Sequence, residues 1–113
     1  MTIHRHGINF VVSLRERVSI DAVAREVGAA LGVTLTESQE RGLKNDYVGE
    51  VLGLDLWLRI SDPATQEVPQ RIALLGQPKE TFGENTTWVD IGPYVAELLT
   101  ARTGRAWTAG TEK

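Results

Sequence analysis

The sequence predicts an α+β domain with a largely antiparallel sheet of four to five strands and two helices packed on one face, in the order β-α-β-β-β-β-α. Several short segments alternate apolar and polar residues, which is typical of strands with one buried face. Two longer segments place apolar residues at helical spacing and end at a glycine. Short loops between consecutive strands favour hairpins, and hairpins pair strands in antiparallel fashion.

The first strand and the first helix follow each other closely. Period-two alternation over residues 8–14 predicts a strand whose even-numbered side chains are buried. Ser19 is a typical N-cap, and an acidic residue follows it in the first turn, where a carboxylate stabilises the helix dipole. Residues 20–31 carry apolar side chains at helical spacing, and Gly32 suits the left-handed position that ends a helix. We therefore expect a helix over residues 20–31.

Three more strands are expected in the middle of the chain. Residues 47–51 and 54–60 both predict strands, and Gly53 between them indicates a tight turn or a bulge. Residues 70–75 predict another strand, which the following Gly-Gln-Pro sequence should close. Shorter β-prone pieces are expected at 33–36 and 87–89, and loops at 37–46, 61–69 and 79–86.

The second helix should begin with Asp90 or Gly92 as its cap and end at Gly104. Trp107 is expected to pack back on the core, so that residues 1–107 form a single domain. The small and polar residues 108–113 are expected to be a disordered tail. The apolar stripe of this helix is predicted to consist of Tyr94, Val95, Leu98 and Leu99.

Composition restricts the classes of function. A chain of 113 residues with 42% hydrophobic and 24% charged residues suits one globular domain. The absence of cysteine excludes disulfides, a thiol nucleophile and cysteine-based metal sites, and it suits a reducing cytosol. No apolar run approaches the roughly 20 residues that span a bilayer, and the first residues do not resemble a signal peptide. We expect a cytoplasmic protein that makes no contact with membranes.

The charge pattern favours a protein partner over a nucleic acid. The net charge is −3, and residues 80–97 contain four carboxylates but no lysine or arginine. Binding to a phosphate backbone needs clustered basic residues, so no nucleic-acid partner is expected. The acidic stretch allows a basic protein partner, although an ordinary solvated surface is the more common reason for such a stretch.

Catalytic and metal-binding motifs are missing from the sequence. His4 and His6 are the only histidines, and two imidazoles need a third ligand to hold a metal ion. Neither a G-x-S-x-G elbow nor a glycine-rich phosphate loop is present. The sequence therefore predicts binding rather than catalysis, with no catalytic residue, metal site or cofactor.

Trp57 is the most informative aromatic residue. In the strand predicted over residues 54–60 it lies on the face opposite the leucines, between Asp55 and Arg59. An exposed tryptophan flanked by charges is typical of protein interfaces. Alternatively, helices cover both faces of the sheet or a loop folds over this residue, and Trp57 is then part of the core.

Three segments resemble a known family. Residues 47–54 read YVGEVLGL, residues 88–99 read WVDIGPYVAELL and residues 103–107 read TGRAW. These motifs resemble those of the small immunity proteins of bacterial polymorphic toxin and contact-dependent inhibition systems, over roughly residues 45–107. The resemblance implies a cytoplasmic antitoxin that binds a cognate toxin, often a nuclease, and blocks its active site or substrate groove. The weak net charge departs from the strongly acidic antitoxins and leaves the toxin class open.

Two hypotheses follow. The first is an inhibitor that binds a toxin with a basic surface. The second is a small-molecule-binding or enzymatic domain with a pocket between sheet and helices. A deep pocket lined by converging polar groups would favour the second, and a flat acidic surface the first. The contact residues predicted for the inhibitor are Glu50, Asp55, Trp57, Glu80, Glu84 and Asp90.

Overall fold

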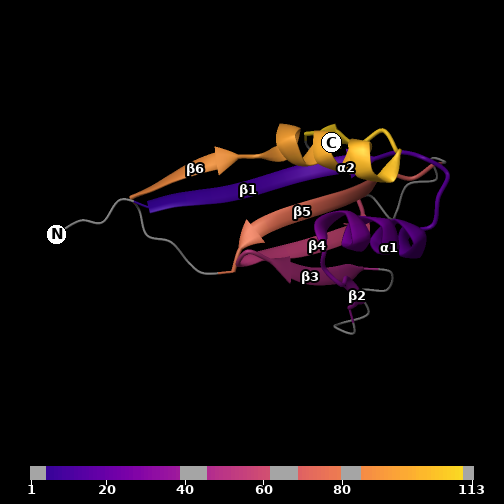
Figure 1. Cartoon of the computed structure of the whole chain (residues 1–113), viewed down its shortest axis with the longest axis horizontal. Coiled ribbons are helices and arrows are strands. Elements are labelled where there is room, and N and C mark those ends of the chain that lie inside the picture. Colours follow the sequence, from indigo (N-terminus) through magenta and orange to yellow (C-terminus); the bar gives the residue numbers. More distant parts are fainter. Residues whose placement is uncertain (1–4, 39–45, 62–68, 80–84, 111–113) are drawn as a thin grey trace.

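The computed structural model describes residues 5–38, 46–61, 69–79 and 85–110 (Figure 1). It contains two helices and a mixed sheet, and this arrangement confirms the predicted α+β class. Along the chain the elements are β1 (Arg5–Leu14), α1 (Ile20–Leu31), β2 (Thr36–Glu37), β3 (Tyr47–Val51), β4 (Leu54–Ile60), β5 (Ile72–Pro78), β6 (Thr86–Asp90), α2 (Gly92–Thr103) and β7 (Thr108–Ala109).

The strands form one sheet in the order β2-β3-β4-β5-β1-β6, and β7 also pairs with β1. Neighbouring strands are antiparallel except for β1 and β6, which are parallel. β6 pairs with residues 5–9 of β1, and β7 pairs with residues 12 and 13 of the same strand. The chain therefore leaves the sheet after β6, forms α2 and then returns to pair with β1 again. The sheet has more strands than the four to five expected. Two of them, β2 and β7, are only two residues long, which is too short to show an alternating pattern in the sequence.

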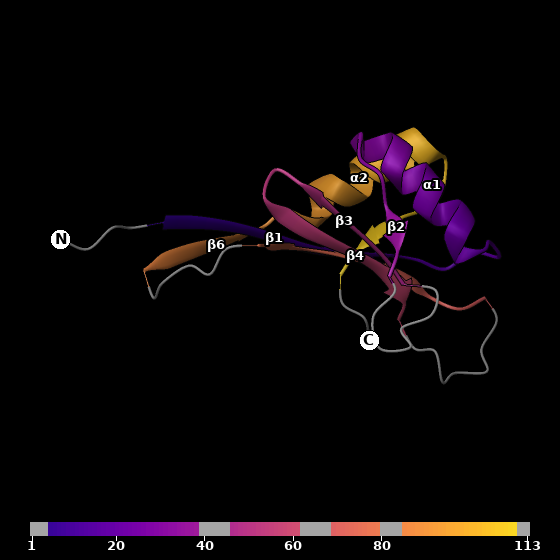
Figure 2. The same ribbon diagram turned by 90° about the horizontal axis from the view of Figure 1, so that it is seen from below.

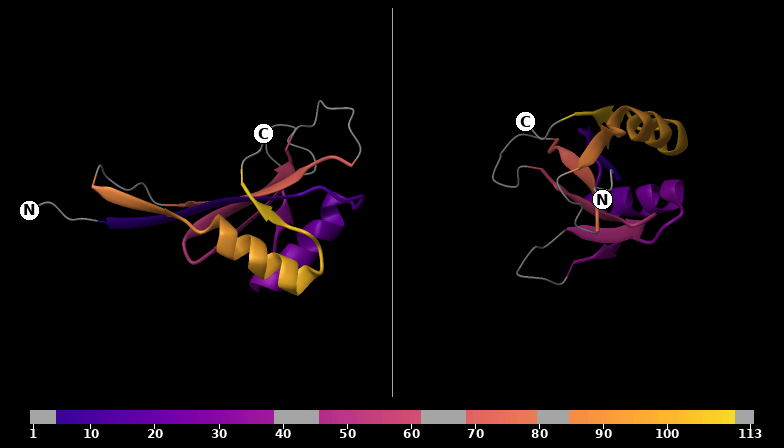
Figure 3. Two further views of the ribbon diagram at one scale, coloured as in Figure 1. Left: turned by 90° about the horizontal axis from the view of Figure 1, so that it is seen from above. Right: turned by 90° about the vertical axis from the view of Figure 1, so that its left-hand side faces the viewer.

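Both helices lie on the same side of the sheet, as the views in Figures 2 and 3 show. Side chains from the facing strands and from both helices fill the space between these layers. The expected burial of the even-numbered β1 side chains is confirmed from Phe10 onward, whereas Ile8 is exposed. The largest fully buried side chains are Leu14, Leu56, Leu58, Leu74, Leu99, Val12, Val23 and Val27.

The predicted boundaries of α1 are confirmed. The Ser19 hydroxyl accepts a hydrogen bond from the Ala22 N–H at 3.4 Å, and Gly32 ends the helix with a left-handed φ of 72°. Arg102 of α2 donates a hydrogen bond to the carbonyl of Ala30 in the last turn of α1. This contact satisfies a carbonyl that has no partner within its own helix, and it ties the two helices together.

The start of α2 differs in detail from the expectation. Ile91 occupies the N-cap position and makes no side-chain cap, while Oδ1 of Asp90 accepts a hydrogen bond from the Gly92 N–H at 2.8 Å. Tyr94 is exposed, so its predicted place in the apolar stripe is wrong. The burial of Val95 and Leu99 is confirmed, Ala96 is buried as well, and Gly104 ends the helix as predicted.

The prediction for the end of β5 is wrong. This strand continues through Gly76 to Pro78, whereas the sequence suggested that it stops before the glycine. The ring of Phe10 lies against Gly76, and a Cβ atom at this position would overlap the ring. Gly76 therefore permits close packing within the strand and does not end it.

The segment after α2 returns to the sheet. Trp107 is buried in the core, as predicted. Thr108 and Ala109 pair with β1, so the expectation of a tail from residue 108 is wrong for these two residues, while residues 111–113 lie outside the described part of the chain. In the parts of the chain that the structure describes, no helix has the length and apolar character needed to cross a membrane.

Candidate functional site on the open sheet face

The sheet face that points away from the helices, called here the open face, carries a row of apolar side chains across four strands. Neighbouring strand residues point to opposite faces, so these residues alternate with the buried core positions. Val48 pairs with Trp57, Trp57 with Leu75, and Leu75 with Val11. The row therefore runs over β3, β4, β5 and β1, with Val48 and Trp57 its exposed members.

Trp57 is held in a fixed orientation. Its indole Nε1–H donates a hydrogen bond to Oδ2 of Asp46 at 2.7 Å, and the guanidinium carbon of Arg59 lies 4.8 Å from the ring centroid. The side chain of Trp57 remains 37% exposed, as the interface hypothesis requires. A cation–π contact and a charge-assisted hydrogen bond restrict the ring before any partner arrives, and this restriction lowers the entropic cost of binding.

A polar row lies beside the apolar row. Glu50 pairs with Asp55, and Asp55 pairs with Gln77. All three side chains are exposed. Lys79 Nζ lies 2.9 Å from Oε1 of Glu50, and this hydrogen bond, together with the charges of Glu50 and Asp55, raises the pKa of Lys79. One carboxylate of the row is therefore partly neutralised within the protein, while Asp55 carries charge on the exposed surface.

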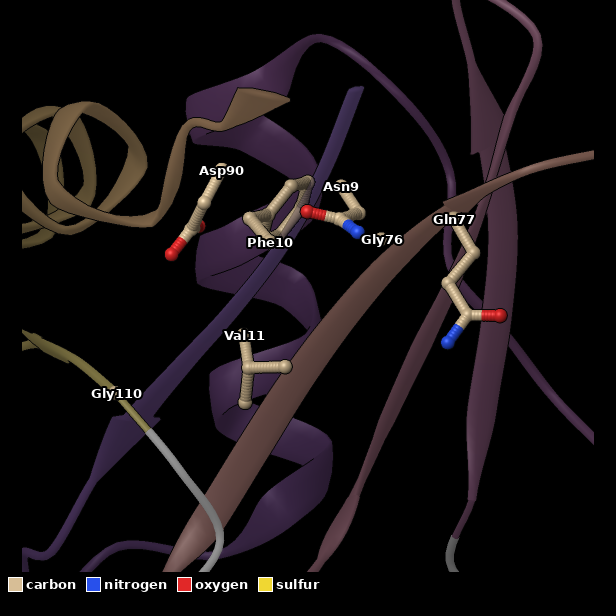
Figure 4. Close-up of a pocket in the computed structure, with 7 residues that line it drawn as sticks. All are labelled: Asn9, Phe10, Val11, Gly76, Gln77, Asp90 and Gly110. Atoms are coloured by element: carbon tan, nitrogen blue, oxygen red, sulfur yellow. The ribbon is translucent and has the colours of Figure 1, made fainter. Parts of the chain in front are cut away.

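The polar row continues into a shallow depression of about 250 Å³ between β5, β1 and β6 (Figure 4). Asn9, Gln77 and Asp90 contribute polar side chains to its lining, and Asn9 pairs with Asp90 across the parallel strands. One oxygen of Asp90 binds the Gly92 N–H, and a carboxylate has further acceptor sites. A carboxylate and two amide groups suit the ammonium group of a lysine or the guanidinium group of an arginine.

Charge is unevenly distributed over the open face. The carboxylates of Glu50, Asp55 and Asp90 lie on one side of the apolar row. On the other side, Arg59 pairs with Ala73, which in turn pairs with Ser13. The face therefore combines an acidic end, where three carboxylates outnumber Lys79, an apolar row containing Trp57, and an end that carries both Arg59 and the carboxylate of Asp46.

The structure brings together four of the six predicted contact residues, Glu50, Asp55, Trp57 and Asp90, on this face. Glu80 and Glu84 lie outside the described residues. Sequence reasoning missed Val48, Leu75, Asn9 and Gln77, because only the strand register makes them neighbours of the predicted residues.

The described part of the chain shows no metal site built around His4 and His6. His4 lies outside that part, and His6 borders a different depression on the helix side of the sheet. Among the described residues, no group of three or more histidine, aspartate or glutamate side chains could hold a metal ion.

Comparisons with known proteins identify no relative of this chain. No protein-family model, curated protein or solved structure matches it. The residues of the open face and their chemistry are therefore the basis for inferring a function.

Proposed function

We propose that this chain is an antitoxin that neutralises a protein toxin by placing its open face on a basic surface of that toxin. The observation that carries this proposal is Trp57, which is exposed, held by Asp46 and Arg59, and bordered by the polar row. A rigid aromatic anchor within a polar rim is the arrangement that dominates binding energy in protein interfaces. The resemblance of residues 47–54 and 88–99 to immunity proteins supports the toxin as the class of partner.

The charge of the acidic end favours a partner that normally binds phosphate groups. A nuclease cleft is lined with lysine and arginine side chains that contact the nucleic-acid backbone. The carboxylates of Glu50, Asp55 and Asp90 would meet such side chains, and the depression beside Asp90 would accept one of them. Complementary charge would also accelerate association. A cytoplasmic location follows from the proposal, because a toxin acting on cellular nucleic acid must be blocked there.

The alternative of a small-molecule or enzymatic domain has less support. It requires a pocket between the sheet and the helices, but that space is filled by side chains such as Val12, Leu58 and Leu99. The depression beside Asp90 lies on the open face, and the depression that His6 borders lies on the helix side but at the end of the sheet, beyond the core.

The test uses the protein encoded by the adjacent open reading frame as the candidate toxin. We expect growth rescue on co-expression and a stoichiometric complex in isothermal titration calorimetry. Trp57→Ala should weaken binding by about 30-fold or more, as expected for a tryptophan anchor worth at least about 2 kcal/mol. Asp55→Asn should weaken it by about 3- to 10-fold, mainly through slower association.

Glu97→Gln is the matched control for Asp55→Asn, because it removes the same charge from an exposed position on α2. We expect it to bind as the wild type does. Thermal unfolding of Trp57→Ala shows whether the variant is folded, and Trp57→Phe tests the ring without the hydrogen bond to Asp46. Unchanged binding by folded Trp57→Ala and Asp55→Asn, or no complex with the wild type, would refute the proposal.

A further inference from the structure

The turn between β3 and β4 carries a leucine that neither burial nor backbone preference explains. Leu52 is 96% exposed and has a positive φ of 51°, and Gly53 follows with a φ of 76°. Val51 pairs with Leu54, so Leu52 and Gly53 between them form a two-residue hairpin loop. Positive φ at both loop positions is the type I′ geometry, in which asparagine is strongly preferred before glycine. A leucine at this position is unfavourable for the isolated fold, which suggests that its side chain has a role in binding.

Leu52 borders an apolar depression. The β3–β4 turn bends toward the side of the sheet that carries the helices (Figure 2). There Leu52, Ile8, Leu54, Pro78 and Ile91 contribute to the lining of a depression of about 350 Å³. Val89 pairs with Ile8 and extends the apolar surface. The tip patch is defined here as Ile8, Leu52, Leu54, Pro78, Val89 and Ile91.

The tip patch lies on the part of the sheet that extends beyond the helix layer (Figures 1 and 2). Ile8 is 42% and Val89 45% exposed, although both are apolar strand residues. In contrast, Phe10 and Val12 follow Ile8 on the same face of β1 and are buried. The patch therefore continues the core-facing side of the sheet into a region where the helices do not cover it.

We propose that the tip patch binds the same patch of a second copy of this chain, with Leu52 of each copy entering the depression of the other. A two-fold interface is formed by one surface that complements itself. The tip patch combines a protruding side chain with an adjacent depression, so it offers both parts that such an exchange needs.

The distribution of charge favours a second copy over a basic partner at this site. The described residues that line the depression include no aspartate, glutamate, lysine or arginine, and His6 at its border is the one ionisable side chain among them. With the His6 imidazole neutral, two patches can therefore meet without like-charge repulsion, even though the chain has a net charge of −3. The nearby Glu50 and Lys79 are paired with each other. The acidic end of the open face would repel its own copy, so the two surfaces suit different partners.

The small size of the patch predicts weak and concentration-dependent association. A few apolar side chains per copy correspond to an interface at the small end of the specific range. We expect a dissociation constant on the order of 10 to 100 µM. Because the contact is apolar, added salt should leave the association constant nearly unchanged.

Sedimentation equilibrium of the full chain tests the proposal. Concentrations from about 5 to about 500 µM bracket the expected dissociation constant. Leu52→Asn should raise the dissociation constant by about 100-fold or more, because each dimer loses two anchors. The same substitution should raise the thermal midpoint of the monomer, since asparagine before Gly53 suits the turn. A loss of association could then not be attributed to misfolding. Leu52→Met is the matched control and should still associate.

Three results would overturn the proposal. The first is a dimer that Leu52→Asn leaves intact. The second is a wild type that stays monomeric at the highest concentration and whose toxin binding Leu52→Asn does not change. The third is a monomeric wild type whose toxin binding Leu52→Asn weakens. The last result would assign the tip patch to the toxin interface. Self-association needs no toxin, so this experiment succeeds or fails independently of the antitoxin proposal.

Discussion

Gly76 and Phe10 face each other on adjacent strands, and their contact explains a glycine in the middle of a sheet. The two residues are register partners in β5 and β1, and Phe10 is buried. A Cβ atom on Gly76 would overlap three carbon atoms of the Phe10 ring. The ring cannot turn away without disturbing a close-packed core. The absence of a side chain at residue 76 is therefore a packing requirement of β1.

Gly76→Ala should lower the free energy of unfolding by about 1 to 3 kcal/mol, which is the usual cost of overpacking a core. Urea denaturation followed by tryptophan fluorescence measures this change. Gln77→Ala is the control, because Gln77 is exposed and its replacement should change stability by no more than about 0.5 kcal/mol. Equal stability of Gly76→Ala and the wild type would show that the ring relocates at no cost.

Residue-level prediction from the sequence succeeded where the cause is local and failed where it is not. Ser19 and Gly32 were identified from the chemistry of helix ends, which depends on a few neighbouring residues. The sequence predicts that the strand is closed by Gly76-Gln77-Pro78, so that Gly76 lies outside it. Its true role depends on Phe10, which lies on another strand and far away in the sequence.

A network around Arg105 ties the segment after α2 to α1 and to the segment that precedes α1. Its guanidinium binds both carboxylate oxygens of Glu26 on α1, at 2.6 and 2.8 Å, and Oε1 of Glu16 at 3.1 Å. The backbone N–H of Ala106 also donates to Glu16, at 3.0 Å. The hydrogen bond from Arg105 lowers the pKa of Glu26 from its ordinary value of 4.5, and the attraction of the guanidinium adds to this effect.

This network should contribute to the dependence of stability on pH. The pKa of Glu26 is lower in the folded than in the unfolded chain, so its contribution is complete above about pH 4.5 and is lost as the pH falls through the folded pKa. Glu26→Gln should lower stability by about 1 to 2 kcal/mol at pH 7, a range that allows for its partial exposure. The difference from the wild type should shrink below pH 4.5.

Urea denaturation at several pH values measures this difference. The pKa of Asp21 is also lowered, through hydrogen bonds from Ser19 and Arg25, but Asp21 is present in both proteins and cancels in the comparison. Glu97→Gln should run parallel to the wild type. A Glu26→Gln deficit that stays constant down to pH 3 would contradict this assignment.

Prediction of whole elements from the sequence had a similar limit. The bounds of α1, β3 and β4 follow from periodicity and turn residues, and the structure confirms them. The short extended piece near Trp88 was expected, but its parallel pairing with β1 was not. Periodicity indicates that a segment is a strand and does not identify its neighbour. For the same reason the sequence placed Trp57 on the open face without indicating that Val48 and Leu75 lie beside it.

The two helices cover one part of the sheet and leave another part uncovered. Under the helices, β4, β5 and the second half of β1 contribute fully buried side chains such as Leu58, Leu74 and Val12. Beyond the helices, β6 and the first half of β1 contribute the exposed Ile8 and Val89. Strands with few buried contacts open at a lower free energy than strands of the core. The two parts should therefore differ in local stability although they share continuous strands.

Amide hydrogen exchange can measure this difference directly. Peptides covering residues 5–9 and 86–90 should exchange at least about 10-fold faster than peptides from β4 and β5, because opening the uncovered part exposes little apolar surface. If a second copy occupies the tip patch, exchange in these two segments should slow as the protein concentration rises, and Leu52→Asn should abolish that dependence. Uniform protection across all strands would show instead that the sheet opens as one cooperative unit, with the uncovered part as stable as the core.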